Sequence, residues 1–251
     1  MASAPSANAG LLRTDFSAPL PAGVAASGSA AVDGGVLKLT NAGAAQGGDF
    51  RVDDLDGDSP VKRMTVSFRM LIGGGTSGPG TSVLSGDGLS FSFASDLPAS
   101  PGSLGEEGAG SGLRVSFDTF DGDGAGAADA IAIDVFFNGA LKGRREFQSS
   151  QGTAGSDFYD VVIDLRGDGT LDLFFGQYQP NVDAPVPVFS GLETEYTPSG
   201  GWTFALAART GNLNDNHWID DLTISTKVPE PGTLALLVLA LGCAAVARSR
   251  R

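Results

Sequence analysis

Residues 112–139 read GLRVSFDTFDGDGAGAADAIAIDVFFNG and contain two strand-like segments around an acidic, glycine-rich turn. Apolar residues alternate with other residues on both sides of the turn, at Leu113, Val115 and Phe117 before it and at Ile131, Ile133 and Val135 after it. A period of two residues is typical of half-buried β-strands. The stretch therefore predicts two neighbouring strands joined by a loop.

The loop itself, DTFDGDG at residues 118–124, holds three carboxylates within six residues. Carboxylate oxygens gathered by a flexible backbone are the ligands that a hard cation such as calcium prefers. The same composition is typical of a solvated Asp/Gly turn that binds nothing. Both interpretations stay open on spacing alone.

Composition points to an acidic, all-β domain. The 251 residues include 37 Gly and 13 Pro, and the formal net charge is −13. Short strand patterns between Gly/Asp/Ser/Asn clusters, without a long amphipathic helical pattern before residue 228, favour a β-sandwich or barrel. Such a charge argues against nucleic acid and anionic membrane surfaces as partners, and favours neutral glycans or divalent cations.

Further strands follow from the same alternation. They are expected at 36–40, 64–71, 86–94, 141–147, 157–165, 170–175, 202–209 and 218–225. Asp168-Gly169 predicts a tight hairpin turn, which explains the Arg-Gly-Asp triplet at 166–168 better than an integrin motif does.

Three connections carry polar residues that need an explanation. The acidic turn 53–58 is expected to be mainly a solvated loop, because no bidentate Glu is nearby. The Pro/Gly-rich excursion at 95–111 is long enough to be functional. The loop 210–217 contains His217, the only histidine, which is expected to be structural or exposed, with contact to a ligand or ion as the alternative.

Several of these segments resemble L-type lectins and the wider group of concanavalin-like jelly rolls. The resemblance covers roughly residues 14–226 and lies, in family order, in Gly86–Ala94, Leu104-Gly105, Gly112–Asp123, Ala130–Gly139 and Gly201–Ile224. It implies an all-β, concanavalin-like jelly-roll sandwich that binds carbohydrate.

The resemblance also implies roles for individual residues. DGLSFSFA is similar to the lectin segment whose Asp binds sugar hydroxyls, which places Asp87 there. FDTFDGDG resembles the calcium segment and implies Asp118 and the carbonyl of Phe120 as ligands. RTGNLNDNHWIDDLTI resembles the last binding loop and implies Gly211 and Asn212 near the sugar.

The sequence departs from the lectin pattern at two positions. The lectin Asn two residues after the aromatic falls on Gly122, so Asp123 is the expected substitute as a calcium ligand. Asp123 cannot donate amide hydrogen bonds to a sugar. The Glu of the legume transition-metal site falls on Ser116, which argues against a two-metal site.

The sequence does not favour an enzyme. The Glu-x-Asp-x-x-Glu strand motif of glucan hydrolases on this jelly roll is absent, and Glu106-Glu107 are adjacent, so they would not face the same way on a strand. One histidine and one cysteine, Cys243, offer no convincing nucleophile and base pair.

The C-terminal 24 residues, VPEPGTLALLVLALGCAAVARSRR, have three parts. Pro229-Glu230-Pro231 is a rigid break. Residues 233–247 are an uncharged, Leu- and Ala-rich run, expected to be a short transmembrane helix. Arg248, Arg250 and Arg251 form a basic stop that favours a cytoplasmic end.

This order is very similar to the PEP-CTERM sorting signal of Gram-negative bacteria. The resemblance implies export, transient anchoring in the inner membrane, recognition by an exosortase near Pro229-Glu230-Pro231, and final placement at the cell surface or in an extracellular polysaccharide matrix. It implies nothing about the ligand of the preceding domain.

The chain is thus expected to have three parts: residues 1–13 as a leader or signal-peptide remnant, 14–226 as the lectin-like sandwich, and 227–251 as the sorting signal. Ala7-Asn8-Ala9 resembles a signal-peptidase site, and a disordered leader is the alternative. The expected function is calcium-dependent carbohydrate binding at the surface. The alternative is a structural or adhesion protein of the matrix that binds no sugar.

Overall fold

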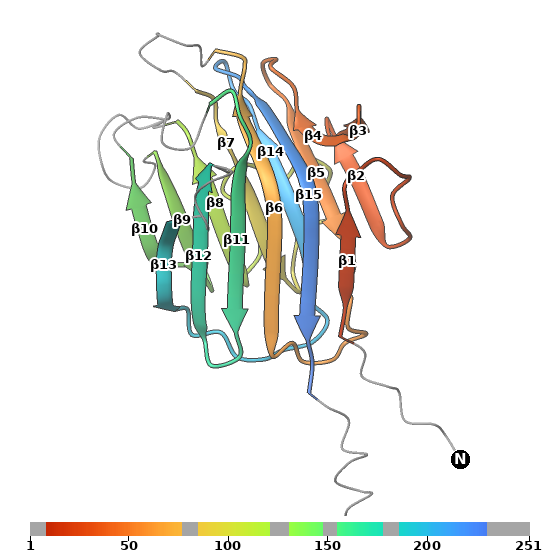
Figure 1. Cartoon of the computed structure of the whole chain (residues 1–251), viewed down its shortest axis with the longest axis vertical. Helices are drawn as coiled ribbons and strands as arrows, with labels where there is room; N and C mark the ends of the chain where they lie inside the picture. The colour runs from red at the N-terminus through yellow and green to blue at the C-terminus, as the bar shows by residue number, and fades with distance from the viewer. Residues whose placement is uncertain (1–8, 77–84, 121–130, 148–154, 178–185, 230–251) are drawn as a thin grey trace, which may run out of the picture.

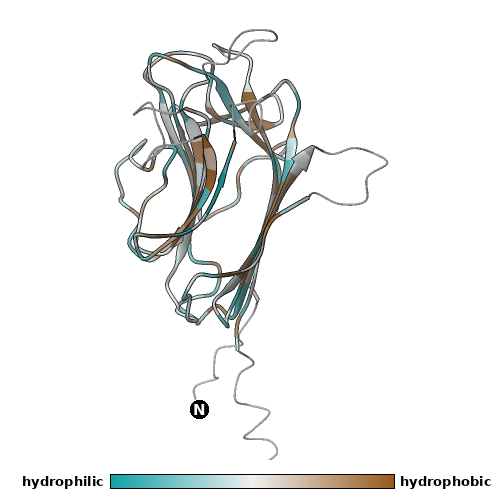
Figure 2. Cartoon of the chain, turned by 90° about the vertical axis from the view of Figure 1, so that its left-hand side faces the viewer, coloured by the Kyte–Doolittle hydropathy of each residue, from teal (hydrophilic) through white to brown (hydrophobic). Residues whose placement is uncertain are grey.

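The structure is a computed structural model that describes residues 9–76, 85–120, 131–147, 155–177 and 186–229. Within this part of the chain there are fifteen β-strands and no helix. The strands form two antiparallel sheets that face each other (Figures 1 and 2). The predicted all-β sandwich is therefore confirmed.

The seven-stranded sheet carries both strands of the 112–139 stretch. Its order is β10 (Ala140–Glu146), β9 (Ala132–Phe137), β8 (Leu113–Asp118), β7 (Gly88–Ala94), β14 (Thr203–Arg209), β5 (Gly47–Val52) and β2 (Val24–Gly28). β8 pairs with β9 in the register Leu113↔Phe137 to Phe117↔Ile133. The predicted pairing around the acidic turn is thus present.

The eight-stranded sheet forms the other layer. Its order is β13 (Val186–Glu193), β12 (Thr170–Gln177), β11 (Tyr159–Arg166), β6 (Arg63–Gly73), β15 (Asn216–Lys227), β4 (Val36–Thr40) and β3 (Ala31–Asp33), with β1 (Leu11–Thr14) also paired to β15. The sandwich therefore begins at Leu11, inside the range 1–13 that the sequence assigns to a leader. Residues 1–8 lie outside the described part of the chain.

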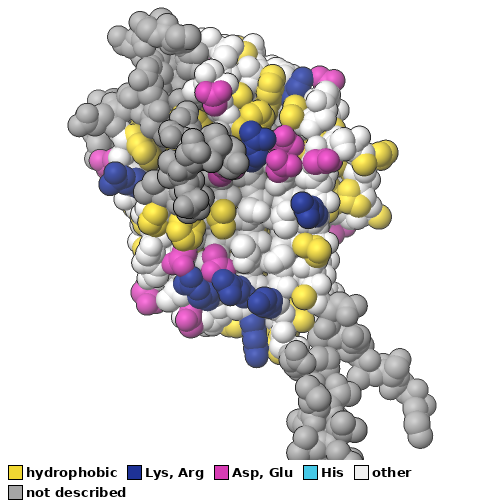
Figure 3. Space-filling model, viewed as in Figure 1, with side chains coloured by type: hydrophobic (Ala, Val, Ile, Leu, Met, Phe, Trp, Pro, Cys, Tyr) yellow, Lys and Arg dark blue, Asp and Glu magenta, His cyan; other side chains and the backbone are white. Residues whose placement is uncertain are grey.

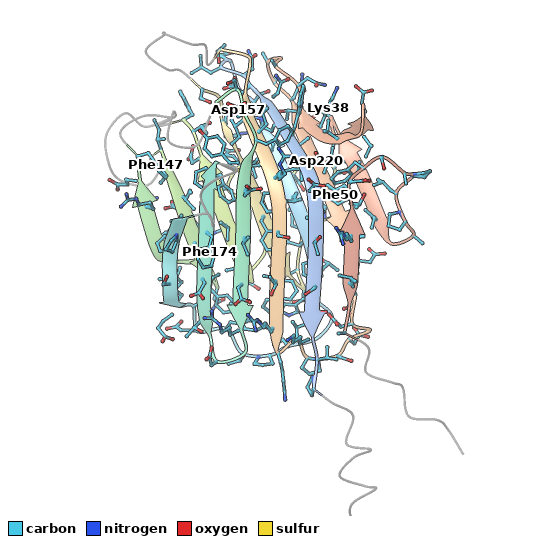
Figure 4. The ribbon with its side chains drawn as sticks, in the orientation of Figure 1. Lys38, Phe50, Phe147, Asp157, Phe174 and Asp220 are labelled. Atoms are coloured by element: carbon cyan, nitrogen blue, oxygen red, sulfur yellow. The ribbon has the colours of Figure 1, made fainter. Side chains whose placement is uncertain are left out.

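The core lies between the sheets and follows from the alternation in sequence. Along β6, RMTVSFRMLIG, buried and half-exposed side chains alternate strictly from Met64 to Ile72. Phe68 of one sheet meets Phe117 of the other edge-on, with ring centroids 6.4 Å apart. Figure 4 labels Phe50, which is fully buried, and Phe174, which is half-buried on β12. Burying one such aromatic side chain stabilises the fold by roughly 1.5–3 kcal/mol.

The turn between β11 and β12 has the predicted hairpin chemistry. Gly169 has a φ of 89°, a conformation that favours glycine. The carboxylate of Asp168 accepts hydrogen bonds from the N–H and the hydroxyl of Thr170, at 3.0 and 2.7 Å. The Arg-Gly-Asp triplet is therefore explained by the turn.

The acidic turn 53–58 is only partly the solvated loop that the sequence predicts. Asp53 and Asp58 are exposed, but Asp56 is 9% exposed. Its Oδ1 accepts hydrogen bonds from the N–H of Gly10 (3.1 Å) and the hydroxyl of Thr226 (2.6 Å). The turn thus ties the start of the chain to the end of β15.

The excursion 95–111 covers the outer face of the seven-stranded sheet. Leu104 packs against Ala205 and Ala207 of β14, and the hydroxyl of Ser90 donates to the carbonyl of Gly105 at 2.7 Å. As a result every residue of β7 is buried. A strand that alternates in sequence is therefore enclosed on both faces.

Both chain ends leave the sandwich at one end, shown at the bottom of Figure 1. The β14–β15 connection lies at the opposite end, because β15 runs the whole length of the sheet. Among the described residues, no helix has the length and apolar character that crossing a membrane requires. The predicted helix 233–247 lies outside those residues.

Candidate functional site

One pocket collects the predicted ligand residues at the end of the sandwich away from the chain termini. It has a volume of about 610 Å³ and is bordered by the start of β7, the end of β8 and the β14–β15 connection. Its lining includes Asp87, Asp118, Phe120, Gly211 and Asn212. The structure therefore brings residues 124 positions apart in sequence (from 87 to 211) into one pocket.

Asp87 immediately precedes β7, and its main chain is held from both sides. Its N–H donates to the carbonyl of Arg209 (3.2 Å), while its own carbonyl accepts the N–H and the hydroxyl of Thr119, each at 3.0 Å. The side chain is 11% exposed, and its Oδ2 lies 3.2 Å from Nε of Arg209. Asp87 is therefore a fixed acceptor in the pocket wall.

Asp118 ends β8 directly opposite Gly88. It is 3% exposed, and its Oδ1 accepts a hydrogen bond from the N–H of Phe120 at 2.9 Å. A carboxylate buried to this extent needs donors or a cation to offset its lost hydration. The hydrogen bond to Asp118 fixes the backbone at Phe120, which also lines the pocket.

The described residues include two of the three predicted calcium ligands. The Asp118 carboxylate and the main-chain carbonyl of Phe120 are hard oxygen donors of the kind that calcium takes. Within the described ranges, no three His, Cys, Asp or Glu side chains are grouped closely enough to hold a metal. Asp123, the third predicted ligand, lies outside them.

The Gly211 segment lies against the carboxylate of Asp87 in the pocket wall. A Cβ atom at this position would lie 3.4 Å from Oδ1 and 3.5 Å from Oδ2 of Asp87. Thr210 anchors the segment, since its N–H donates to Gln46 (3.0 Å) and its hydroxyl donates to Gly43 (2.7 Å). Asn212 follows and is exposed at the pocket.

Two further charged residues line the pocket that sequence reasoning does not predict. Arg209, the last residue of β14, pairs with both Asp87 and Glu106. Glu106 comes from the excursion 95–111, and its burial raises the pKa of its carboxyl group. With Asp87, Glu106 and Asp118 against one guanidinium, the pocket carries an excess of negative charge.

The sequence contains only weak signals that these two residues belong to a site. Arg209 ends a predicted strand, and Glu106 is one of two adjacent acids in a long loop. Their ion pair joins residues 103 positions apart, so no local pattern connects them.

His217 lies beside this site in a buried polar network. Its Nδ1 is 2.6 Å from the hydroxyl of Thr40, which also bonds to the carbonyl of Asp215 at 3.2 Å. The carboxylate of Asp215 accepts the N–H of Gly75 (2.9 Å) and the hydroxyl of Ser85 (2.6 Å). These contacts fit the structural interpretation of the histidine, because they fasten the loops around the pocket.

The sorting residues lie almost entirely beyond the described part of the chain. Pro229 is described and half-buried, directly after β15. The other predicted residues, Glu230, Pro231, Arg248, Arg250 and Arg251, fall outside.

Comparison with protein families identifies a PEP-CTERM protein-sorting motif at residues 227–251. The chain therefore carries this sorting motif at its C-terminus, as the sequence resemblance implies. The comparison with curated protein sequences gave no match.

Comparison with solved structures finds L-type and legume lectins. The Ca²⁺-bound exoplasmic/lumenal domain of VIP36 has a TM-score of 0.63 and 17% identity, covering 88% of this chain and 91% of that one. Lectin II from Ulex europaeus has a TM-score of 0.63 and 16% identity, with 87% and 98% covered. The Bauhinia forficata lectin in complex with GalNAc has a TM-score of 0.63 and 13% identity, with 88% and 99% covered.

At these identities the likeness establishes the fold. The chain is an L-type lectin-like β-sandwich followed by a PEP-CTERM motif.

Proposed function

We propose that this protein is an exported carbohydrate-binding protein that uses calcium and is sorted by an exosortase to the cell surface or extracellular matrix. The observation that carries the proposal is the meeting of Asp87, Asp118, Phe120, Gly211 and Asn212 in one pocket. The domain acts by binding and not as an enzyme.

Calcium would be held by the carboxylate of Asp118, the carbonyl of Phe120 and Asp123. The bound ion would fix the loop after β8 and offset the negative charge of the pocket. Asp87 would accept hydrogen bonds from sugar hydroxyls, and the segment at Gly211 and Asn212 would supply main-chain and amide donors.

The charges in the pocket favour a neutral sugar over an acidic one. Arg209 is already paired with Asp87 and Glu106, so little of its positive charge remains to attract an anion. The net charge of −13 further disfavours a polyanionic ligand.

Sorting would proceed through the C-terminal motif in the order of its parts. Residues 233–247 would anchor the chain in the inner membrane, and Arg248, Arg250 and Arg251 would keep the end in the cytoplasm. The exosortase would then act near Pro229-Glu230-Pro231, and the sandwich would reach the surface or the polysaccharide matrix.

The first test is thermal unfolding of the full chain in detergent, with calcium and with a chelator. Calcium raises the unfolding midpoint if it binds the folded state more tightly than the unfolded state. We expect a saturable rise that is lost in Asp118→Ala and kept in Asp53→Ala, which removes an exposed carboxylate from the acidic turn 53–58. No rise at millimolar calcium would remove the ion from the proposal.

A glycan array probed with and without calcium tests the proposed carbohydrate binding. Calcium-dependent binding of neutral glycans supports the lectin. A saturable calcium shift without any glycan bound favours the second candidate, a structural or adhesion protein of the matrix. That candidate is supported by Gly122 in place of the lectin Asn.

A further inference from the structure

The excursion 95–111 is fastened to the seven-stranded sheet where it enters the pocket. Side chains of β7 and β8 donate hydrogen bonds to three consecutive carbonyls of the excursion. The pairs are Ser90 with Gly105 (2.7 Å), Ser116 with Glu106 (2.9 Å) and Arg114 with Glu107 (3.2 Å). Because the donors come from two adjacent strands, the main chain at Glu106 is fixed relative to the sheet.

The side chain of Glu106 is 11% exposed and pairs with Nη2 of Arg209. Arg209 is 56% exposed and uses Nε to reach Oδ2 of Asp87 at 3.2 Å. The three side chains form a chain of contacts from a fixed carboxylate, through an exposed guanidinium, to the predicted sugar-binding carboxylate.

An exposed arginine on its own holds a carboxylate weakly, because it loses side-chain entropy and remains solvated. A second carboxylate that is itself immobile reduces the number of conformations open to the guanidinium. The planar guanidinium donates in fixed directions, so fixing one of its edges also orients the other.

We propose that Glu106 is a positioning residue that acts through Arg209 to hold the carboxylate of Asp87 in the orientation that accepts sugar hydroxyls. The inference rests on the proposed carbohydrate binding. It gives the excursion 95–111 a role: the excursion delivers Glu106 to the pocket and makes ligand binding depend on how this loop is seated.

The test measures binding of mannose, galactose and N-acetylgalactosamine to the full chain with calcium, by calorimetry. Glu106→Gln should weaken binding about tenfold, the loss expected for one charge-assisted contact. Glu107→Gln removes the same charge from the neighbouring residue and should leave affinity unchanged. In an Asp87→Asn background, Glu106→Gln should cause no further loss.

A readout without sugar separates this inference from the proposed function. The carboxyl ¹³C resonance of Asp87 at neutral pH should move in Glu106→Gln and stay in place in Glu107→Gln. If sugars bind and Glu106→Gln changes neither affinity nor this resonance, the positioning role is overturned and the lectin stands. If no sugar binds, the lectin fails and the resonance alone decides whether Glu106 orients Asp87. Should Glu106→Gln fail to fold, Arg209→Met removes the guanidinium that joins Glu106 to Asp87. We expect the same weakening of sugar binding and the same movement of the Asp87 resonance.

Discussion

His217 is completely buried, and its ring is held by the hydroxyl of Thr40. That hydroxyl has one proton and donates it to the carbonyl of Asp215, so we assign the Nδ1–H tautomer to His217, with Nδ1–H donating to Thr40. Nε2 has no hydrogen-bond partner among the described residues. A charged imidazolium would therefore lose its hydration without gaining an acceptor at Nε2.

The pH dependence of stability follows from this environment. Burial lowers the pKa of His217 from its ordinary value of 6.5 to about 3, so as the pH falls the unfolded chain takes up this proton before the folded chain does. The stabilisation is complete above pH 6.5 and is lost as the pH falls toward 3. Lowering the pH from 7.5 to 5.5 should reduce the free energy of unfolding by about 1.4 kcal/mol through His217.

Urea unfolding of wild type and His217→Gln at both pH values measures this cost as the difference between the two proteins, since the carboxyl groups contribute to both. Equal pH slopes would contradict the assignment. In the wild type, the ring resonances of His217 should not titrate between pH 7.5 and 4.5.

At the scale of single elements, one buried carboxylate fastens Gly10, the residue before β1, to the end of β15, in addition to the pairing of β1 with β15. Asp56 accepts hydrogen bonds from the N–H of Gly10 and the hydroxyl of Thr226, and its burial raises the pKa of its carboxyl group. Thr226→Val removes a donor from this buried acceptor and should destabilise the fold by about 1–3 kcal/mol. Thr223→Val, on the half-exposed face of β15, is the matched control and should change little in denaturant unfolding. Equal losses in both variants would mean that β15 simply tolerates valine poorly.

How far the sequence predicts these elements depends on how local their causes are. β8 and β9 follow from the alternation that starts at Leu113 and resumes at Ile133, and the β11–β12 hairpin follows from Asp168-Gly169. In each case the pattern and the element occupy the same few residues. The pocket could be anticipated only through the family resemblance, because its members come from separate connections.

The remaining elements depend on contacts that no local pattern encodes. β7 alternates like a half-exposed strand, yet it is buried on both faces because the excursion 95–111 bonds to Ser90 and Ser92. The pairing of Glu106 with Arg209 depends on where that excursion ends. β1 is a strand because it pairs with β15. Its four residues alone do not predict this pairing.

At the scale of the whole molecule, the pocket and the sorting motif lie at opposite ends of β15. The strand has 12 residues, which separate the two ends by about 36 Å at roughly 3.3 Å per residue. Figure 3 shows basic side chains gathered near the end where the chain leaves, and there Arg63 pairs in register with Arg166 and with Lys227. Arg63 and Arg166 both pair with Asp164, and Arg166 also pairs with Asp172, so these carboxylates offset part of the positive charge of the cluster.

This geometry predicts how the anchored protein stands on a membrane. If residues 233–247 span the bilayer, the pocket points away from it, because only five residues, 228–232, separate the end of β15 from that segment. A fluorophore near the exit should lie close to the headgroups, and one at the pocket should not.

The measurement uses the full chain in vesicles with a short-range quencher on the lipid headgroups. Cys243→Ser removes the only cysteine, after which Thr197→Cys labels the exit end and Asn212→Cys labels the pocket. Thr197 lies at the exit end because the same connection bonds through Ser199 to Val61, next to Lys62, whose N–H donates to Lys227. Quenching should be strong at 197 and absent at 212. Quenching at both sites would mean that the sandwich lies flat with its pocket against lipid, and quenching at neither would contradict anchoring through the C-terminal run.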